Sequence, residues 1–99
     1  MESKTSFSIV IPLYNKEEYI CKSIDSVLEQ NYDEFEIVVV DDGSKDKSYQ
    51  LVASRYESNR KVRLIQQKNA GPAAARNTGV NYSRMEWILF LDADDILLP

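Results

Sequence analysis

Three aspartates follow directly after an apolar run near the end of the chain. Residues 87 to 95 read WILFLDADD, which places Asp92, Asp94 and Asp95 within four positions of one another. Clustered carboxylates repel one another, and hard oxygen ligands of this kind suit Mg²⁺ or Mn²⁺. The chain has no histidine and a single cysteine, so we do not expect a zinc site here. The cluster is a candidate divalent metal site, with an acidic solvated loop as the alternative.

A second acidic group, the pair Asp41 and Asp42, follows the apolar run VVV and precedes Gly43 and Ser44. Glycine permits a tight turn with positive φ, and serine can cap a following helix. A carboxylate at a strand end can also accept hydrogen bonds from a base or a ribose. The two acids by themselves leave both interpretations open, ordinary turn chemistry and ligand binding.

A third motif, NAGPAAARNTG, spans residues 69 to 79 and contains Gly71, Pro72 and Arg76. Proline suits the first position of a helix, and a helix N-terminus near Gly71 can offer N–H groups to an anion. Arg76 can bind a phosphate with its guanidinium fork. The motif lacks the Gly-Lys-Ser/Thr ending of a P-loop, and no GxGxxG occurs in the chain. A capped surface helix with a solvated arginine is the alternative.

The segment IPLYN closes the first apolar run with Pro12, Tyr14 and Asn15. Tyr14 can stack on a base, although the chain has six tyrosines and any one of them can be structural. Asn15 can cap the helix predicted after it. Cys21, on that helix, is expected to be a small buried residue.

Hydrophobic periodicity predicts the elements that position these residues. Residues 7–13, 35–40 and 87–91 are near-continuous apolar runs, typical of parallel strands buried on both faces. Residues 62–65 alternate, as a strand nearer an edge does. Helical spacing predicts two amphipathic helices, one with the apolar stripe Ile20, Ile24, Val27 and Leu28 and one with the stripe Tyr49, Val52, Ala53 and Tyr56. A third helix would contain Ala73, Ala74 and Ala75, whose small side chains would let it pack closely.

This alternation of strands and helices predicts an α/β three-layer sandwich with a mainly parallel sheet and right-handed crossovers. In such sheets, ligands bind beyond the carboxyl ends of the strands. All four motifs follow the end of a predicted strand. We therefore expect them to meet along one rim of the sheet.

Size and composition limit the class of protein. With 99 residues the chain suits a single domain, 1–99, and 12 basic against 16 acidic residues argue against a nucleic-acid partner. No apolar stretch approaches the roughly 20 residues of a transmembrane helix. We expect a cytoplasmic protein, in solution or at the cytoplasmic face of a membrane. The apolar ending DILLP predicts that the chain is a fragment of something longer.

Taken together, IPLYN, EIVVVDDGSKD, NAGPAAARNTG and FLDADD resemble the nucleotide-binding half of family 2 glycosyltransferases, from about Phe7 to Pro99. The resemblance implies a Rossmann-like fold of GT-A type. It also implies transfer of a sugar from a nucleotide diphosphate donor to an acceptor hydroxyl, with inversion and with Mn²⁺ or Mg²⁺ as cofactor. A UDP-sugar donor, a saccharide or lipid-linked acceptor and a role in polysaccharide biosynthesis would follow.

The same resemblance assigns roles to individual residues. Tyr14 would lie against the base, Asp42 would hydrogen-bond it, and Asp41 would support the turn. Arg76 would approach the donor. Asp92 and Asp94 match the family's DxD acids and would contact ribose and metal, with Asp95 beside them as a further metal ligand. The other donor-site residues would be Pro12, Asn15 and Gly43. The family continues beyond the position of Pro99 into an acceptor half, where we expect the general base.

Three alternatives deserve comparison. A receiver-type phosphoacceptor domain also has an acidic pair at a strand end, but after its first strand rather than its second. A nucleotidyltransferase would need a glycine-rich basic loop after the first strand, where this chain has IPLYNKEEY. A non-catalytic nucleotide-binding module remains compatible with every motif.

Overall fold

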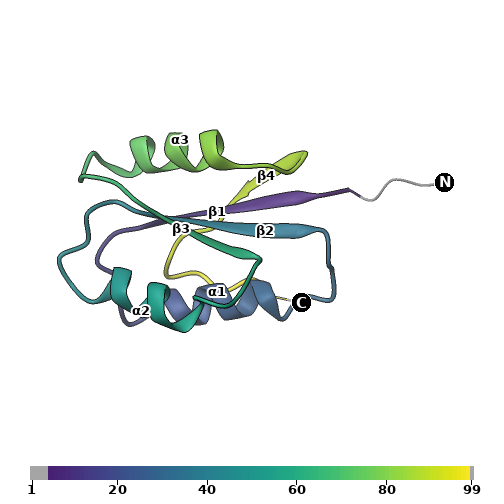
Figure 1. Cartoon of the computed structure of the whole chain (residues 1–99), viewed down its shortest axis with the longest axis horizontal. Coiled ribbons are helices and arrows are strands. Elements are labelled where there is room, and N and C mark those ends of the chain that lie inside the picture. The colour runs from purple at the N-terminus through teal and green to yellow at the C-terminus, as the bar shows by residue number, and fades with distance from the viewer. Residues whose placement is uncertain (1–4, 99) are drawn as a thin grey trace.

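The computed structural model describes residues 5–98, in which four strands alternate with three helices (Figure 1). The strands and helices are, in chain order, β1 (Phe7–Leu13), α1 (Ile20–Leu28), β2 (Phe35–Asp41), α2 (Ser48–Arg55), β3 (Val62–Gln66), α3 (Pro72–Tyr82) and β4 (Trp87–Phe90). The predicted order of elements is confirmed. None of the helices in the described part is long and apolar enough to cross a membrane.

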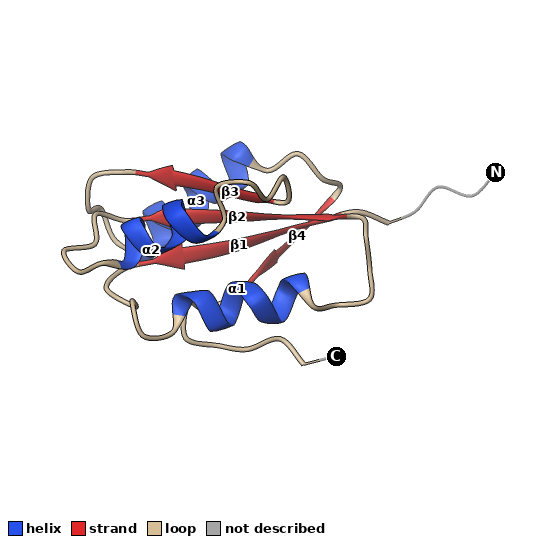
Figure 2. Cartoon of the chain, turned by 60° about the horizontal axis from the view of Figure 1, so that its bottom comes forward, coloured by secondary structure: helices blue, strands red, loops and turns tan. Residues whose placement is uncertain are grey.

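The strands form one sheet in the order β3-β2-β1-β4, and every neighbouring pair is parallel. Helices α1 and α2 cover one face and α3 covers the other (Figures 1 and 2). The strand order reverses after β3, because β4 pairs with β1 on the side away from β2. Ligand sites in parallel sheets occur beside such a reversal. The predicted α/β sandwich is confirmed, and its reversal point lies at the carboxyl ends of β1 and β4.

Alternation along the two central strands creates two cores. Side chains of one parity, such as Ile9, Ile11 and Val39, pack under α1 and α2, whereas Val10 and Val38 pack under α3. Both strands are buried on both faces, as their continuous apolar runs predict.

The prediction that residues 87–91 are buried on both faces is wrong. β4 is an edge strand, and Trp87, Leu89 and Phe90 are 57%, 47% and 51% exposed. An apolar run alone cannot distinguish a central strand from an edge strand, because strand order is set by pairing across the sheet. β3 is the other edge strand, as its alternation predicts.

Two predicted helix caps are also wrong. α1 begins at Ile20 and α2 at Ser48, neither with a side-chain cap, so Asn15 and Ser44 lie several residues too early. Both side chains instead bond across the gap between the two loops. Pro72 does begin α3, as predicted. Cys21 is only half-buried against the larger core.

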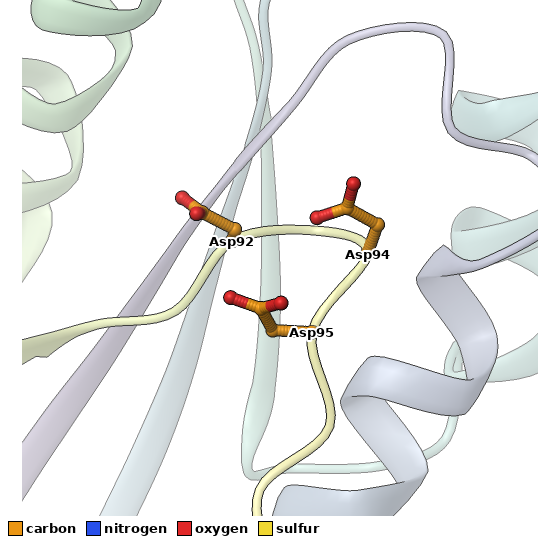
Figure 3. A group of neighbouring side chains, drawn as sticks. All are labelled: Asp92, Asp94 and Asp95. Atoms are coloured by element: carbon orange, nitrogen blue, oxygen red, sulfur yellow. The ribbon is translucent and has the colours of Figure 1, made fainter.

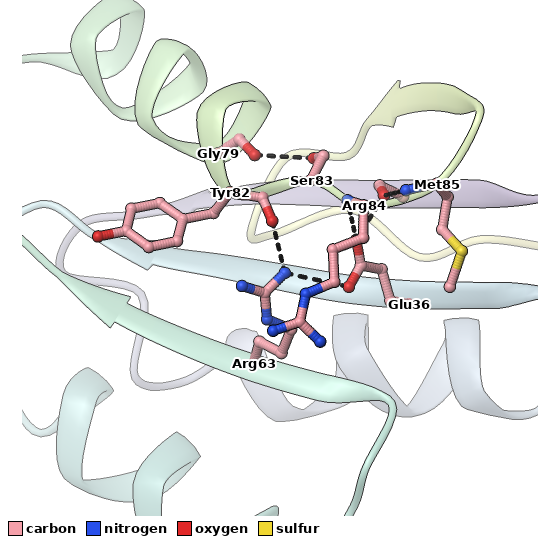
Figure 4. A network of polar contacts seen from close by, with 8 residues as sticks. Glu36, Arg63, Gly79, Tyr82, Ser83, Arg84 and Met85 are labelled. Carbon is pink, nitrogen blue, oxygen red and sulfur yellow. Dashed lines mark hydrogen bonds and ion pairs between the residues drawn. The ribbon is translucent and has the colours of Figure 1, made fainter.

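A buried carboxylate fixes the connection between α3 and β4 at the amino end of the sheet (Figure 4). Glu36 on β2 is 4% exposed and accepts hydrogen bonds from the Ser8 hydroxyl at 2.6 Å and the Arg84 N–H at 2.7 Å. Arg63 completes the group with a 3.1 Å ion pair. Burial by itself would raise the pKa of Glu36, but the bonds from Ser8, Arg84 and Arg63 outweigh it and hold the pKa below its ordinary value of 4.5.

We expect Glu36→Gln to lower the free energy of unfolding at pH 7 by about 1–3 kcal/mol, since Gln brings an N–H₂ group among donors. The folded-state pKa is depressed, so the carboxylate stabilises the fold above its unfolded pKa and this contribution is lost as the pH falls through the folded pKa. Urea unfolding from pH 7 down to pH 3 should therefore show the gap between wild type and variant closing. A gap independent of pH would contradict this account.

Helix α3 lies close to the sheet at Gly79. A Cβ added there would come within 2.2 Å of Cγ1 of Val10, a side chain in the middle of β1. Of the three alanines predicted to allow close packing, Ala75 is the one that is fully buried. Small residues on this face set the height of α3 above the sheet.

We expect Gly79→Ala to destabilise the fold by about 1–3 kcal/mol, the cost of overpacking a full core, despite the better helix propensity of alanine. Urea unfolding at constant pH measures it. Asn81→Ala, an exposed change on the same helix, is the control and should shift stability by less than about 0.5 kcal/mol. A Gly79→Ala protein as stable as this control would show that α3 shifts without cost.

Candidate functional site

A pocket opens where the carboxyl ends of the strands meet the N-terminus of α3. Its volume is about 600 Å³. We call it the rim pocket, and it is lined by Pro12, Leu13, Tyr14, Lys16, Asp42, Asn69, Gly71, Pro72, Ala75, Arg76, Asp92, Ala93 and Asp94. These residues come from four separate stretches of sequence, each following a strand or beginning α3.

Six of the residues predicted from sequence line this one pocket: Pro12, Tyr14, Asp42, Arg76, Asp92 and Asp94. Four others do not, although Asp41 is the last residue of β2 and the other three lie in the adjoining loops: Asn15, Gly43 and Asp95. These six residues therefore lie together along one rim of the sheet, as expected from the sequence. The second group consists of residues that shape the loops, together with one acid of the DADD cluster.

Asp42 joins the end of β2 to the start of α3. Its side chain is 3% exposed and accepts four hydrogen bonds. Two come from the backbone N–H groups of Ala70 at 2.9 Å and Gly71 at 3.0 Å. The others come from side-chain amides, Gln67 at 2.8 Å and Asn69 at 3.2 Å. This carboxylate holds the loop before α3 against the sheet, a role that its position in the sequence did not reveal.

Asp41 points to the opposite face of the sheet, since neighbouring strand residues alternate. It is fully buried, and its Oδ2 accepts the Ser44 N–H at 3.2 Å, a bond within the turn that follows β2. Its Oδ1 is buried and has no hydrogen-bond partner among residues 5–98. Gly43 has φ of 77°, as its place in the turn predicts, and a Cβ there would lie 2.9 Å from the Asn69 backbone nitrogen.

The loop after β1 is clamped to the loop after β2. Asn15 takes a positive φ of 52°, its N–H donates to Ser44 Oγ at 2.9 Å, and its Oδ1 accepts the Lys45 N–H at 2.8 Å. Next to it, the Lys16 N–H donates to the buried Ser48 hydroxyl at 2.9 Å. Left-handed backbone is tolerated by asparagine, and these bonds fix it. Tyr14 and Lys16 are thereby held at the pocket.

The three aspartates of the DADD cluster lie on one tight loop after β4 (Figure 3). All three are exposed, and each offers a carboxylate oxygen within 4.8 Å of the others. Between them, Ala93 is buried, and its carbonyl accepts the Ser23 hydroxyl of α1 at 2.8 Å. The loop is thus fastened to the core while its acids face outward. A cluster of hard oxygen donors at this spacing fits Mg²⁺ or Mn²⁺.

Two pocket residues with polar side chains were not among the predicted site residues. Lys16 lines the pocket, and its Nζ lies 3.7 Å from Oδ2 of Asp94. Asn69 lines it too, between the Asp42 carboxylate and α3. Lysine and asparagine are common surface residues, and their only signal was position: Lys16 follows the segment IPLYN, and Asn69 is the first residue of NAGPAAARNTG.

The sequence model of glycosyl transferase family 2 matches residues 8–99. The chain belongs to this family. The receiver-type and nucleotidyltransferase alternatives are thereby set aside, and the identification that the four motifs suggested is confirmed.

Curated relatives and solved structures agree with this assignment. The chain is 42% identical over 88 residues to glycosyltransferase GlyA of Streptococcus pneumoniae, covering 89% of this chain and 13% of that protein. It is 41% identical to an uncharacterized glycosyltransferase of Haemophilus influenzae, covering 91% of this chain and 36% of that one. The chain therefore spans well under half the length of these relatives.

Among solved structures, S. aureus TarS in complex with UDP-GlcNAc matches with a TM-score of 0.83 at 36% identity, over 91% of this chain and 27% of that one. The mannosyltransferase PcManGT of Pyrobaculum calidifontis, in complex with GDP-Man and Mn²⁺, matches with a TM-score of 0.85 at 28% identity, over 93% and 28%. The GT-A type of fold is confirmed by these neighbours.

We expect Asp42→Asn to loosen the loop before α3. Asparagine keeps one acceptor oxygen and turns its N–H₂ group toward other donors, which costs about 1–3 kcal/mol. Amide hydrogen exchange, read at Ala70 and Gly71, should accelerate in the variant. Asp33→Asn, at an exposed acid in the loop before β2, is the matched control. Unchanged protection at both amides would rule out the anchoring role.

Proposed function

We propose that this chain is the donor-binding half of a metal-dependent, inverting glycosyltransferase that moves a sugar from a UDP-sugar to a saccharide or lipid-linked acceptor. The observation that carries the proposal is the rim pocket, which gathers an aromatic ring and three aspartates from the ends of three strands and an arginine from the first half of α3. Its volume of about 600 Å³ is in the range of small-molecule sites. Family membership and the nucleotide-sugar complexes of TarS and PcManGT support this choice.

The nucleotide would lie between the loop after β1 and the start of α3. Tyr14 is 39% exposed at the pocket, which leaves a ring face for a base. A base N–H that reaches Asp42 would replace the side-chain amide of Gln67 or Asn69 as a donor to the carboxylate. The two backbone N–H donors would stay in place. Arg76, exposed on α3 and lining the pocket, would approach the diphosphate.

A divalent cation would be held by Asp92 and Asp94, with Asp95 as a further ligand. When bound, such a cation stabilises the negative charge that develops on the departing diphosphate. The chain's own contribution is geometric, because β4 and the bond from Ser23 to the Ala93 carbonyl fix the loop that carries the acids. Acids held in place before the donor arrives need little reorganisation when it binds.

The acceptor hydroxyl needs a general base. In the rim pocket, the carboxylates among the described residues are Asp42, Asp92 and Asp94, and each has another task in this proposal. We therefore place the base outside residues 1–99, in keeping with the greater length of the relatives. On this view, the single domain 1–99 is one part of a larger cytoplasmic enzyme.

Calorimetric titration of UDP into the protein, with and without Mn²⁺, tests the donor site. We expect binding that requires the metal and is weakened at least tenfold by Asp94→Ala, because the diphosphate otherwise meets bare carboxylates. Asp33→Ala, which removes an exposed acid outside the pocket, should leave the affinity unchanged. Equal, metal-independent affinity in all three proteins would count decisively against the proposal.

A further inference from the structure

Lys16 lines the rim pocket beside Asp94 of the DADD cluster. Its Nζ lies 3.7 Å from Oδ2 of Asp94, and the two side chains are 42% and 45% exposed. The lysine follows β1 and the aspartate follows β4, so the ion pair spans the point where the strand order reverses. No motif identified in the sequence includes this residue.

The backbone of Lys16 is fixed more firmly than its half-exposed side chain suggests. Its N–H donates to the buried Ser48 hydroxyl at 2.9 Å, and its carbonyl accepts the N–H groups of Tyr19 at 3.0 Å and Ile20 at 2.9 Å. The preceding Asn15 is locked in its left-handed conformation by the neighbouring loop. The ammonium group is therefore attached to a hydrogen-bonded, fixed backbone through a flexible four-carbon side chain.

Charge explains why a tethered ammonium suits this position. The three aspartates bring three negative charges within 4.8 Å, and among the described residues Lys16 is the base that forms an ion pair with them. A divalent cation on the same carboxylates would repel the ammonium at close range. A donor diphosphate in the pocket would offer it a new partner, within the reach of a lysine stem.

We infer that Lys16 is a donor-binding residue with two successive partners. It neutralises Asp94 in the free protein, and it pairs with the diphosphate of the donor once a divalent cation occupies the aspartates. This inference rests on the proposed donor site and extends it. Lysine suits the exchange better than arginine, because a compact ammonium makes no bidentate fork with one carboxylate and can turn from one partner to the other.

Substitution of Lys16 by methionine, which keeps the apolar stem and removes the charge, separates the two roles. We expect Lys16→Met to bind Mn²⁺ alone more tightly, by about three- to tenfold, because one competing positive charge a few ångströms away is gone. We expect the same variant to bind UDP about tenfold more weakly at saturating Mn²⁺, because one charge-assisted contact is lost. Free Mn²⁺ is counted by electron paramagnetic resonance, and UDP binding is measured by calorimetry.

Opposite shifts of the two affinities are the signature of this exchange. Lys22→Met, an exposed lysine of α1 outside the pocket, is the matched control and should shift neither. Unchanged Mn²⁺ and UDP affinities in Lys16→Met, or two shifts in the same direction, would overturn the inference while leaving the donor site standing. A wild-type protein that binds UDP equally well without Mn²⁺ would instead overturn the proposed function, and the role of Lys16 with it. Thermal unfolding of both variants checks that the fold is intact.

Discussion

Parallel pairing of β1 with β2 in a fixed register is the constraint on which the rest of the molecule depends. Leu13 lies opposite Asp41, and Asp41 lies opposite Gln66 on β3, so three strands end side by side. Each strand is followed by a polar loop, and the loops therefore emerge at one edge. A slip of one residue would turn Asp42 away from α3 and bury charge among the valines of the other face.

Hydrogen bonds between these loops turn a set of strand ends into a preformed pocket. The Asp42 carboxylate fastens the start of α3, and the Asn15 amide fastens the loop after β1 to the loop after β2. The polar side chains of the rim thus bond mainly to backbone groups of other loops. The apolar layers and the Glu36 group hold the opposite end of the sheet, which leaves the rim free to carry exposed charge.

Local sequence was a sound guide where a signal is repeated along one element. The strands and helices follow from continuous apolar runs, from stripes at helical spacing and from Pro72 at a helix start. Local sequence failed to predict the position of a strand in the sheet, which depends on pairing with strands distant in the sequence. The apolar run at residues 87–91 reads like a central strand, yet β4 lies at an edge, because strand order is decided by pairing energies across the sheet.

The candidate site shows the same division. Sequence by itself determined which residue types follow each strand, and it predicted that Tyr14, Arg76, Asp92 and Asp94 would meet at one rim. That they bind a nucleotide and a hard cation there is our proposal. Only the tertiary structure decided which groups these rim residues contact. The Asp42 carboxylate accepts hydrogen bonds from the loop before α3, Asn15 joins two loops instead of capping a helix, and Lys16 forms an ion pair with Asp94. The physical reason is that hydrogen bonds and ion pairs form between groups 28 to 78 residues apart, and their partners are fixed by distances in space that no local pattern encodes.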